Sequence, residues 1–176
     1  MIKKFSIAMV LLAGLIMSFA LISNWNITGG SEISFKLGMV AGSIGGLKGS
    51  IAFDPGDPTN SNMDITLDLS TITTGNGMRD KDIKNESVWF DSAKFPKIAF
   101  KSSSVTQTAT GYLVEGTLTM KGISKKIQIP FKFAHKENEG TFIGTFTLNR
   151  LDYGVGKSSI LVKDSVEVLI AVPVKR

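Results

Sequence analysis

Residues 111–148 read GYLVEGTLTMKGISKKIQIPFKFAHKENEGTFIGTFTL, and this stretch decides the fold class. Apolar and polar residues alternate in three runs, which short turns separate at residues 121–124 and 137–140. A period of two is typical of a strand with one buried and one wet face, and short turns join antiparallel neighbours. The stretch therefore predicts three consecutive antiparallel β-strands.

The same alternation continues on both sides of this stretch. Further runs precede it at residues 33–37, 47–53, 63–69 and 97–101, and a last run at residues 166–174 ends the chain. Eight one-sided strands need a closed barrel or a sandwich to hide their apolar faces and their edges. The sequence thus predicts an all-β fold.

One segment, between the third and fourth runs, breaks this rhythm. Residues 74–95 read TGNGMRDKDIKNESVWFDSAKF, and their polar part at residues 78–87 predicts a short helix. Bulky apolar residues follow that helix: Val88, Trp89, Phe90 and Phe95. We expect this crossing to cover one end of the barrel, and the irregular stretch 152–164 to do similar work.

Length and composition fit one globular domain. The chain has 176 residues, 43% of them hydrophobic, with no domain boundary and no low-complexity linker in the sequence. The absence of cysteine excludes disulfides, thiolate metal sites and cysteine nucleophiles. The formal net charge is +5, but basic residues are scattered among acidic ones, so no dense basic run predicts nucleic-acid binding.

Residues 1–23 have the layout of a secretory signal peptide. Two lysines precede an almost unbroken apolar run at residues 5–22, and Ser18-Phe19-Ala20 offers small residues for cleavage. The run is also near the lower limit of about 17–20 residues for a membrane span, so an uncleaved anchor is the alternative, with membrane association through the leader. Either interpretation predicts a domain at residues 24–176 that is periplasmic or secreted in a bacterium.

The titratable residues do not predict catalysis or a metal site. His135 is the only histidine and lies next to a turn, so it can build neither a multi-histidine zinc site nor a pair with cysteine. Asp54–Asp57 is better explained as a turn than as part of a calcium loop. Gly42–Ser50 departs from the phosphate-loop pattern, and no helix follows it. We therefore expect no catalytic residue, no metal and no cofactor.

The apolar faces of the runs are the remaining candidate site. Gly49, Gly116 and Gly144 fall on these faces, where glycine either lets a strand bend or leaves room inside. An eight-stranded barrel can be filled by side chains or can hold one ligand. From the residues alone, a filled core and a cavity for an apolar ligand both stay open.

Several short motifs follow one another in a distinctive order. The most specific is WFDSAKFPKIAF at residues 89–100, which comes after Arg79-Asp80. The others are Trp25-Asn-Ile, Ser31-x-Ile33-x-Phe35 and residues 46–54, 70–74, 116–125, 149–154 and 162–166. In this order the motifs resemble the YceI-like family of exported, lipocalin-like polyisoprenoid-binding proteins, over Trp25–Val174. The resemblance implies a single eight-stranded antiparallel lipocalin-like barrel, with a short helix between strands three and four and a long apolar tunnel.

Two positions depart from the family pattern. Gly30 stands where the family often has a histidine before the serine of the first strand. Asp82 stands where the family often has a histidine after Arg79-Asp80. If those histidines touch the polar end of a ligand, this protein binds a different head group.

On this resemblance we predict a non-catalytic protein that binds, transports or stores a long apolar lipid, such as a polyisoprenoid, an isoprenoid quinone or a fatty acid. Arg79 is the expected head-group contact, while Trp89 and Phe90 are expected to close the mouth. The expected lining is Phe35, Phe53, Leu67, Phe100, Leu118, Phe131, Phe133, Phe146 and Ile170. The alternative is a structural or stress-response barrel with a filled core. The oligomeric state, including a homodimer, stays open.

Overall fold

The computed structural model describes residues 23–160 and 162–176, so the leader predicted at residues 1–23 lies outside the described residues except for Ser23. Strands dominate the described chain. They are β1 (Asn24–Ile27), β2 (Glu32–Leu37), β3 (Val40–Ile44), β4 (Lys48–Ala52), β5 (Asn62–Asp68), β6 (Lys97–Thr108), β7 (Gly111–Met120), β8 (Ile123–Lys136), β9 (Glu139–Asn149) and β10 (Ser165–Lys175). The helical elements are α1 (Gly77–Asn85) and short 3-10 helices at Pro58–Asn60, Leu69–Thr71 and Arg150–Tyr153.

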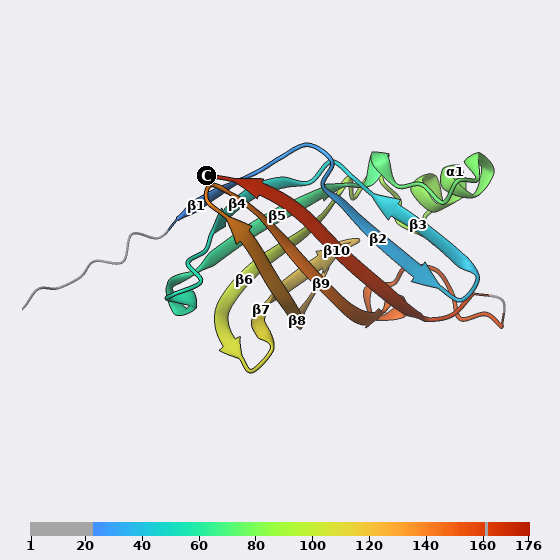
Figure 1. The fold of residues 1–176 in the computed structure, drawn as a ribbon. Coiled ribbons are helices and arrows are strands. Elements are labelled where there is room, and N and C mark those ends of the chain that lie inside the picture. The colour runs from blue at the N-terminus through green and yellow to red at the C-terminus, as the bar shows by residue number, and fades with distance from the viewer. Residues whose placement is uncertain (1–22, 161) are drawn as a thin grey trace, which may run out of the picture.

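Eight of these strands form a closed antiparallel ring (Figure 1). Their order is β1-β4-β5-β6-β7-β8-β9-β10, and β1 closes the ring because it pairs with both β4 and β10. The hairpin β2–β3 continues the wall beside β10. Closure pairs the strand edges and encloses the apolar faces, as one-sided strands require. The prediction of one eight-stranded barrel, with a helix between its third and fourth predicted strands, is confirmed.

Two of the ten strands, β1 and β3, are absent from the sequence prediction. β1 and β2 both pair with β10, at different heights, and the next position in the wall is likewise shared by β3 and β4. The two interruptions contain Gly30 and Gly46, whose φ angles are +86° and +63°. Glycine adopts such angles at no steric cost, so the chain can change strand partners there.

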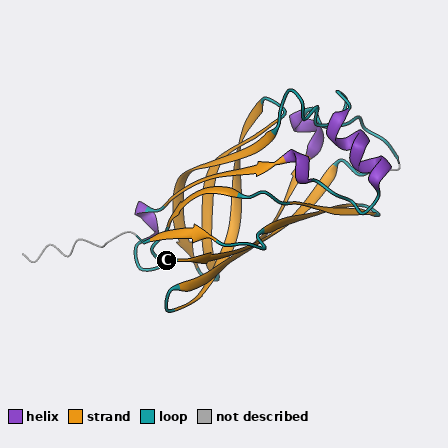
Figure 2. Cartoon of the chain, turned by 90° about the horizontal axis from the view of Figure 1, so that it is seen from above, coloured by secondary structure: helices purple, strands orange, loops and turns teal. Residues whose placement is uncertain are grey.

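The helix α1 lies across one end of the barrel, together with the connections that flank it (Figure 2). The side chain of Asn76 caps α1 by accepting a hydrogen bond of 3.1 Å from the Arg79 amide. The Asp80 carboxylate accepts bonds of 2.6–2.8 Å from the Thr73 hydroxyl and from the amide and hydroxyl of Thr74. These bonds hold a helix that buries no residue fully. We call this the α1 end of the barrel, and the opposite end the β1 end.

Candidate ligand-binding site

An apolar cavity runs inside the barrel. The centre of a water molecule can reach about 240 Å³ of this space, far more than the roughly 10–15 Å³ that one buried water needs. Its walls come from every strand of the ring except β1, and from the hairpin β2–β3, α1 and the segments after α1 and β9. Apolar side chains make up almost the whole lining, so the cavity favours an apolar occupant.

Half-exposed residues on the inner wall show that the middle of the barrel is hollow. On β10, Val166 and Ile170 point inward and line the cavity, yet neither is fully buried. The lining continues from Val166 to Val172 on this strand, which corresponds to about 20 Å at the usual rise per residue. The space is therefore elongated along the wall, as a chain-like ligand requires.

Aromatic rings fill the β1 end and form a floor under the cavity. Phe53 is 0% exposed, and its ring centroid lies 5.2 Å from that of Phe133 and 5.4 Å from that of Phe142. Trp25 packs edge-on against Phe133, with centroids 4.9 Å apart, and its indole N–H donates a 3.0 Å hydrogen bond to the Phe53 carbonyl. Such edge-to-face contacts favour a fixed arrangement of rings. The floor closes this end of the cavity.

Glycines let two phenylalanine rings lie against the wall. A Cβ added to Gly116 would be 2.5 Å from the tip of the Phe100 ring, and one added to Gly42 would be 2.5 Å from the tip of the Phe35 ring. Both rings therefore occupy the place of a missing side chain on a neighbouring strand. Because the rings lie along the wall, the middle of the lumen stays open. At the inward glycines, neighbouring atoms occupy the space that a side chain would take. At Gly144 the atom nearest to an added Cβ is the Pro130 carbonyl oxygen.

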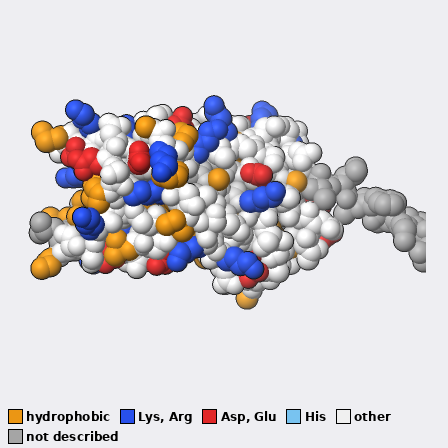
Figure 3. Space-filling model, turned by 180° about the vertical axis from the view of Figure 1, so that it is seen from behind, with side chains coloured by type: hydrophobic (Ala, Val, Ile, Leu, Met, Phe, Trp, Pro, Cys, Tyr) orange, Lys and Arg blue, Asp and Glu red, His pale blue; other side chains and the backbone are white. Residues whose placement is uncertain are grey.

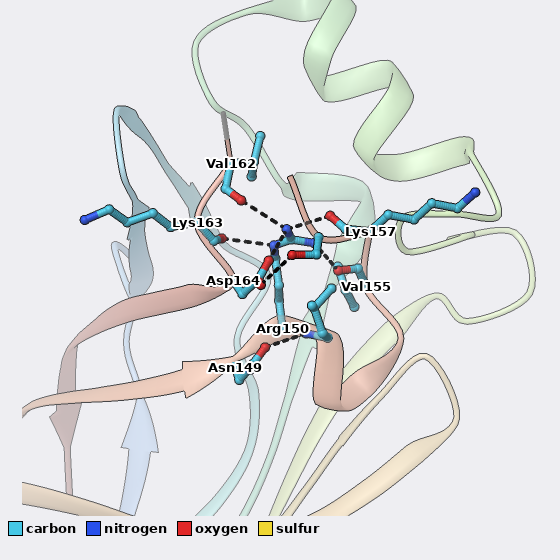
Figure 4. Close-up of polar contacts among 9 residues, drawn as sticks. Asn149, Arg150, Val155, Lys157, Val162, Lys163 and Asp164 are labelled. Carbon is cyan, nitrogen blue, oxygen red and sulfur yellow. Dashed lines mark hydrogen bonds and ion pairs between the residues drawn. The ribbon is translucent and has the colours of Figure 1, made fainter. Parts of the chain in front are cut away.

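Arg150 is the one charged side chain among the described residues that line the cavity, and it is 3% exposed. Its guanidinium donates a 2.8 Å bond to Asp164 (Figure 4) and lies 5.6 Å from the Trp89 ring centroid. It also donates to four backbone carbonyls, those of Val155, Lys157, Val162 and Lys163. The ion pair and these carbonyls satisfy the charge, as a buried ion needs. Arg150 thus fixes residues 155–157 and 162–164 of the connection before β10 against Trp89.

The structure brings nine of the predicted site residues to the cavity wall. They are Phe35, Leu67, Trp89, Phe90, Phe100, Leu118, Phe131, Phe146 and Ile170. Phe53 and Phe133 instead belong to the aromatic floor, because they lie at the β1 end, where rings fill the lumen. Arg79 is exposed on α1, outside the lining. Contact of any of these residues with a ligand stays a prediction.

Sequence reasoning missed part of the lining. Ile72, Val155 and Arg150 come from irregular segments between strands, where no period of two marks the inward side. Met63 and Val114 do lie on predicted strands with the correct parity, so the alternation contains their signal. Parity alone does not rank the inward residues of a strand, so it does not single out these two.

The titratable groups outside the cavity make local structural contacts. His135 is exposed, and its ring stacks on Phe133 with centroids 5.3 Å apart. Hydrogen bonds from the Thr59 and Asn60 side chains lower the pKa of Asp57, in the predicted turn. Burial, with a smaller contribution from Asp152, raises the pKa of Tyr153, so its phenol stays neutral near pH 7.

Residues 23–160 and 162–176 contain no group of three or more His, Cys, Asp or Glu side chains placed to hold a metal ion. Within the same residues, no helix has both the length and the hydropathy to cross a bilayer.

Comparisons with curated proteins give partial matches. The chain is 30% identical over 98 residues to a UPF0312 protein of Yersinia pestis, an alignment covering 56% of this chain and 50% of the relative. A UPF0312 protein of Yersinia enterocolitica is 29% identical over the same length. The chain thus matches about half the length of these curated relatives.

Solved structures of similar fold include BcnA of Burkholderia cenocepacia, with a TM-score of 0.79, 24% identity and coverage of 84% of this chain and 99% of that one. The Campylobacter jejuni YceI protein has a TM-score of 0.70 at 19% identity, with 99% of both chains covered. A polyisoprenoid binding domain from Saccharophagus degradans has a TM-score of 0.65 at 12% identity, over 88% of this chain and 99% of that one. At these identities the likeness shows the fold.

The family model for the YceI-like domain matches residues 25–174. This range contains the whole closed ring except for the ends of β1 and β10. The chain therefore belongs to the YceI-like family.

Proposed function

We propose that this protein binds a long apolar lipid inside its barrel and carries or stores it without chemical conversion. The observation that carries the proposal is the elongated apolar cavity above the aromatic floor. Burial of apolar ligand surface contributes about 25 cal/mol per Å², so a long hydrocarbon chain gains the most from this lining. Polyisoprenoids, isoprenoid quinones and fatty acids share that chemistry. The polyisoprenoid binding domain of the same fold supports this choice.

The two ends of the cavity suggest the direction in which the lipid enters. The β1 end is closed by packed rings that offer no partner for a polar group. At the α1 end the lining includes Ile83, Trp89 and Phe90, all of which are half-buried. The lipid tail would therefore lie on the floor, with its polar end toward α1, where Arg79 is the proposed contact. A periplasmic or secreted location is part of this proposal and rests on the predicted leader.

Two adjacent residues of β10 allow a matched test. Ile170 lines the cavity, whereas Leu169 points outward and is 46% exposed. Ile170→Trp should fill the lumen, and Leu169→Trp should leave it unchanged. Each protein would be purified from bacterial cells and examined by native mass spectrometry, followed by organic extraction of bound lipid. Delipidated samples would then be offered a polyprenyl alcohol or a long-chain fatty acid.

We expect the wild type and Leu169→Trp to retain lipid, and Ile170→Trp to lose at least nine-tenths of it while keeping its circular dichroism spectrum, because the added ring takes the volume of the guest. Wild-type protein that neither carries lipid nor takes up either compound would overturn the proposal and favour a barrel acting through its surface. Normal lipid content in folded Ile170→Trp would place the ligand elsewhere.

A further inference from the structure

The most exposed large hydrophobic side chains gather at the α1 end. Met39 and Ile160 are fully exposed, at 102% and 103%, and Met78 is 78% exposed. The other large hydrophobic residues on the described surface, such as Ile143 and Leu169 on the barrel wall, reach at most 46%. Exposed apolar tips concentrated in one place indicate an interaction surface.

The three tips belong to three segments at the α1 end of the barrel. Met39 lies in the turn between β2 and β3, and Met78 is in the first turn of α1. Ile160 lies in the connection that Arg150 fixes, and this connection is next to the β2–β3 turn, because a Cβ on Gly38 would be 3.5 Å from the Lys163 side chain. The space-filling view shows hydrophobic side chains projecting from this end of the molecule (Figure 3).

Basic residues surround these tips. They are Arg79, Lys81, Lys84, Lys157 and Lys163, and none of them forms an ion pair with another described residue. Among the acids of this end, Asp80 accepts hydrogen bonds from Thr73 and Thr74, and Asp164 pairs with Arg150. Asp82 on α1 and Glu86 after it form no ion pair with another described residue. The five basic residues outnumber Asp80, Asp82 and Glu86, so the α1 end offers protruding apolar tips together with an excess of positive charge.

We propose that the α1 end docks on a membrane surface that contains anionic phospholipids, with Met39, Met78 and Ile160 inserted among the lipid head groups. Apolar side chains framed by lysine and arginine are suited to this interface, because the tips leave water while the cations meet the anionic lipids. Three separate protruding tips suit a deformable lipid surface better than a flat protein interface. The docked mouth would face the bilayer, so a guest could pass between membrane and cavity without crossing water. This use rests on the proposed lipid-binding function, whereas the docking itself does not.

The absence of cysteine allows a site-specific test on the full chain. Single variants Met39→Cys, Met78→Cys and Ile160→Cys would each carry an environment-sensitive fluorophore, with Leu169→Cys as the matched control on the barrel wall. Vesicles would consist of phosphatidylcholine alone, or of equal parts phosphatidylcholine and phosphatidylglycerol. All variants share the same leader, so a difference between labels reports the orientation of the barrel.

With anionic vesicles we expect a blue shift in emission at the three tips, no shift at Leu169, and a weaker shift at high salt. Added Lys157→Glu and Lys163→Glu changes should reduce the shift at Met39 at least fivefold, whereas Lys126→Glu and Lys132→Glu on the wall should not. The proposal would be overturned by equal shifts at all four labels or by equal shifts on neutral vesicles. A concentration-dependent shift without vesicles would also overturn it, because it would indicate self-association. Extracted lipid from the same preparations would show separately whether the cavity binds its guest.

Discussion

At the scale of single residues, the width of the lumen depends on glycines that accommodate aromatic rings. At Gly116 the Phe100 ring and the Lys101 carbonyl oxygen both lie 2.5 Å from the position of an added Cβ. Real Cβ contacts are longer than this, so a methyl group would force either the ring into the lumen or the two strands apart. Gly116 thereby contributes to the cavity through its neighbour.

We predict that Gly116→Ala lowers the free energy of unfolding by about 1–3 kcal/mol, the usual cost of overpacking, and reduces the amount of bound lipid. Gly77→Ala is the control, because nothing lies within 4 Å of its added Cβ at the start of α1. That change should be neutral or slightly stabilising, since alanine favours helix more than glycine does. Urea unfolding of both variants measures the difference, and equal stabilities would contradict this account of Gly116.

The inward side of each strand could be predicted from the sequence, but the position of each residue along the barrel axis, its height, could not. Phe131 and Phe133 have the same parity on β8, and both were expected in the lining. Two residues of strand, about 7 Å, separate Phe131 on the cavity wall from Phe133 in the floor. Height depends on the register of eight strands and on which rings meet across the lumen. That information comes from pairs of residues distant in sequence, so the alternation of one strand does not contain it.

At the scale of elements, α1 is held mainly by polar contacts. Hydrogen bonds from Thr74 and Thr73 lower the pKa of Asp80 below its ordinary value of 3.8. Because the folded-state pKa is lowered, the stabilising contribution is complete above the unfolded value and disappears as the pH falls through the folded value. The helix should therefore be held firmly at neutral pH and loosen in acid below pH 3.8.

Hydrogen exchange at the Thr74 amide, which donates to Asp80 at 2.7 Å, tests this clamp. Asp80→Ala should speed exchange at Thr74 at least tenfold at neutral pH and remove the acid-induced loosening of α1. Asp82→Ala is the control on the same helix, because no hydrogen bond of its carboxylate is seen among the described residues. Unchanged protection in Asp80→Ala would show that other contacts hold α1.

Two short strands, β1 and β3, cannot be predicted from the local sequence pattern. The eight predicted strands correspond to β2 and to β4 through β10, and all of them contain the alternation. β1 has four residues and β3, read as VAGSI, has few large side chains, so neither produces a clear period of two. Both strands form because their neighbours in the wall offer unpaired backbone groups, which is a tertiary cause.

At the scale of the whole molecule, stability and binding are separated along the barrel axis. The aromatic floor and the cluster around Val105 and Val174 supply close packing at the β1 end. Side chains in the hollow part, such as Phe146, have partner atoms on one side only and gain less from dispersion. The filled end can therefore stabilise a wall that surrounds empty space.

Truncation of one ring in each part tests this separation. Phe53→Ala should lower the free energy of unfolding by about 3–5 kcal/mol, as expected for a fully buried phenylalanine, with little effect on bound lipid per folded molecule. Phe146→Ala should cost less stability but change lipid retention. Chemical unfolding combined with lipid extraction gives both quantities, and a reversed pattern would place the ligand in the floor.

The short strand β1 closes the ring, and it is the place where the ring should open first. β1 joins its neighbours through two residue pairs with β4 and two with β10, whereas β9 and β10 share eleven. The four-residue strand closes the ring through few backbone pairs. Trp25 anchors this strand, because its indole is buried among the floor rings and donates a hydrogen bond to the Phe53 carbonyl. Local opening of β1 would expose the backbone edge of β4 and the part of β10 that the hairpin β2–β3 does not cover, so aggregation of a damaged sample should begin at the barrel's amino-terminal strand.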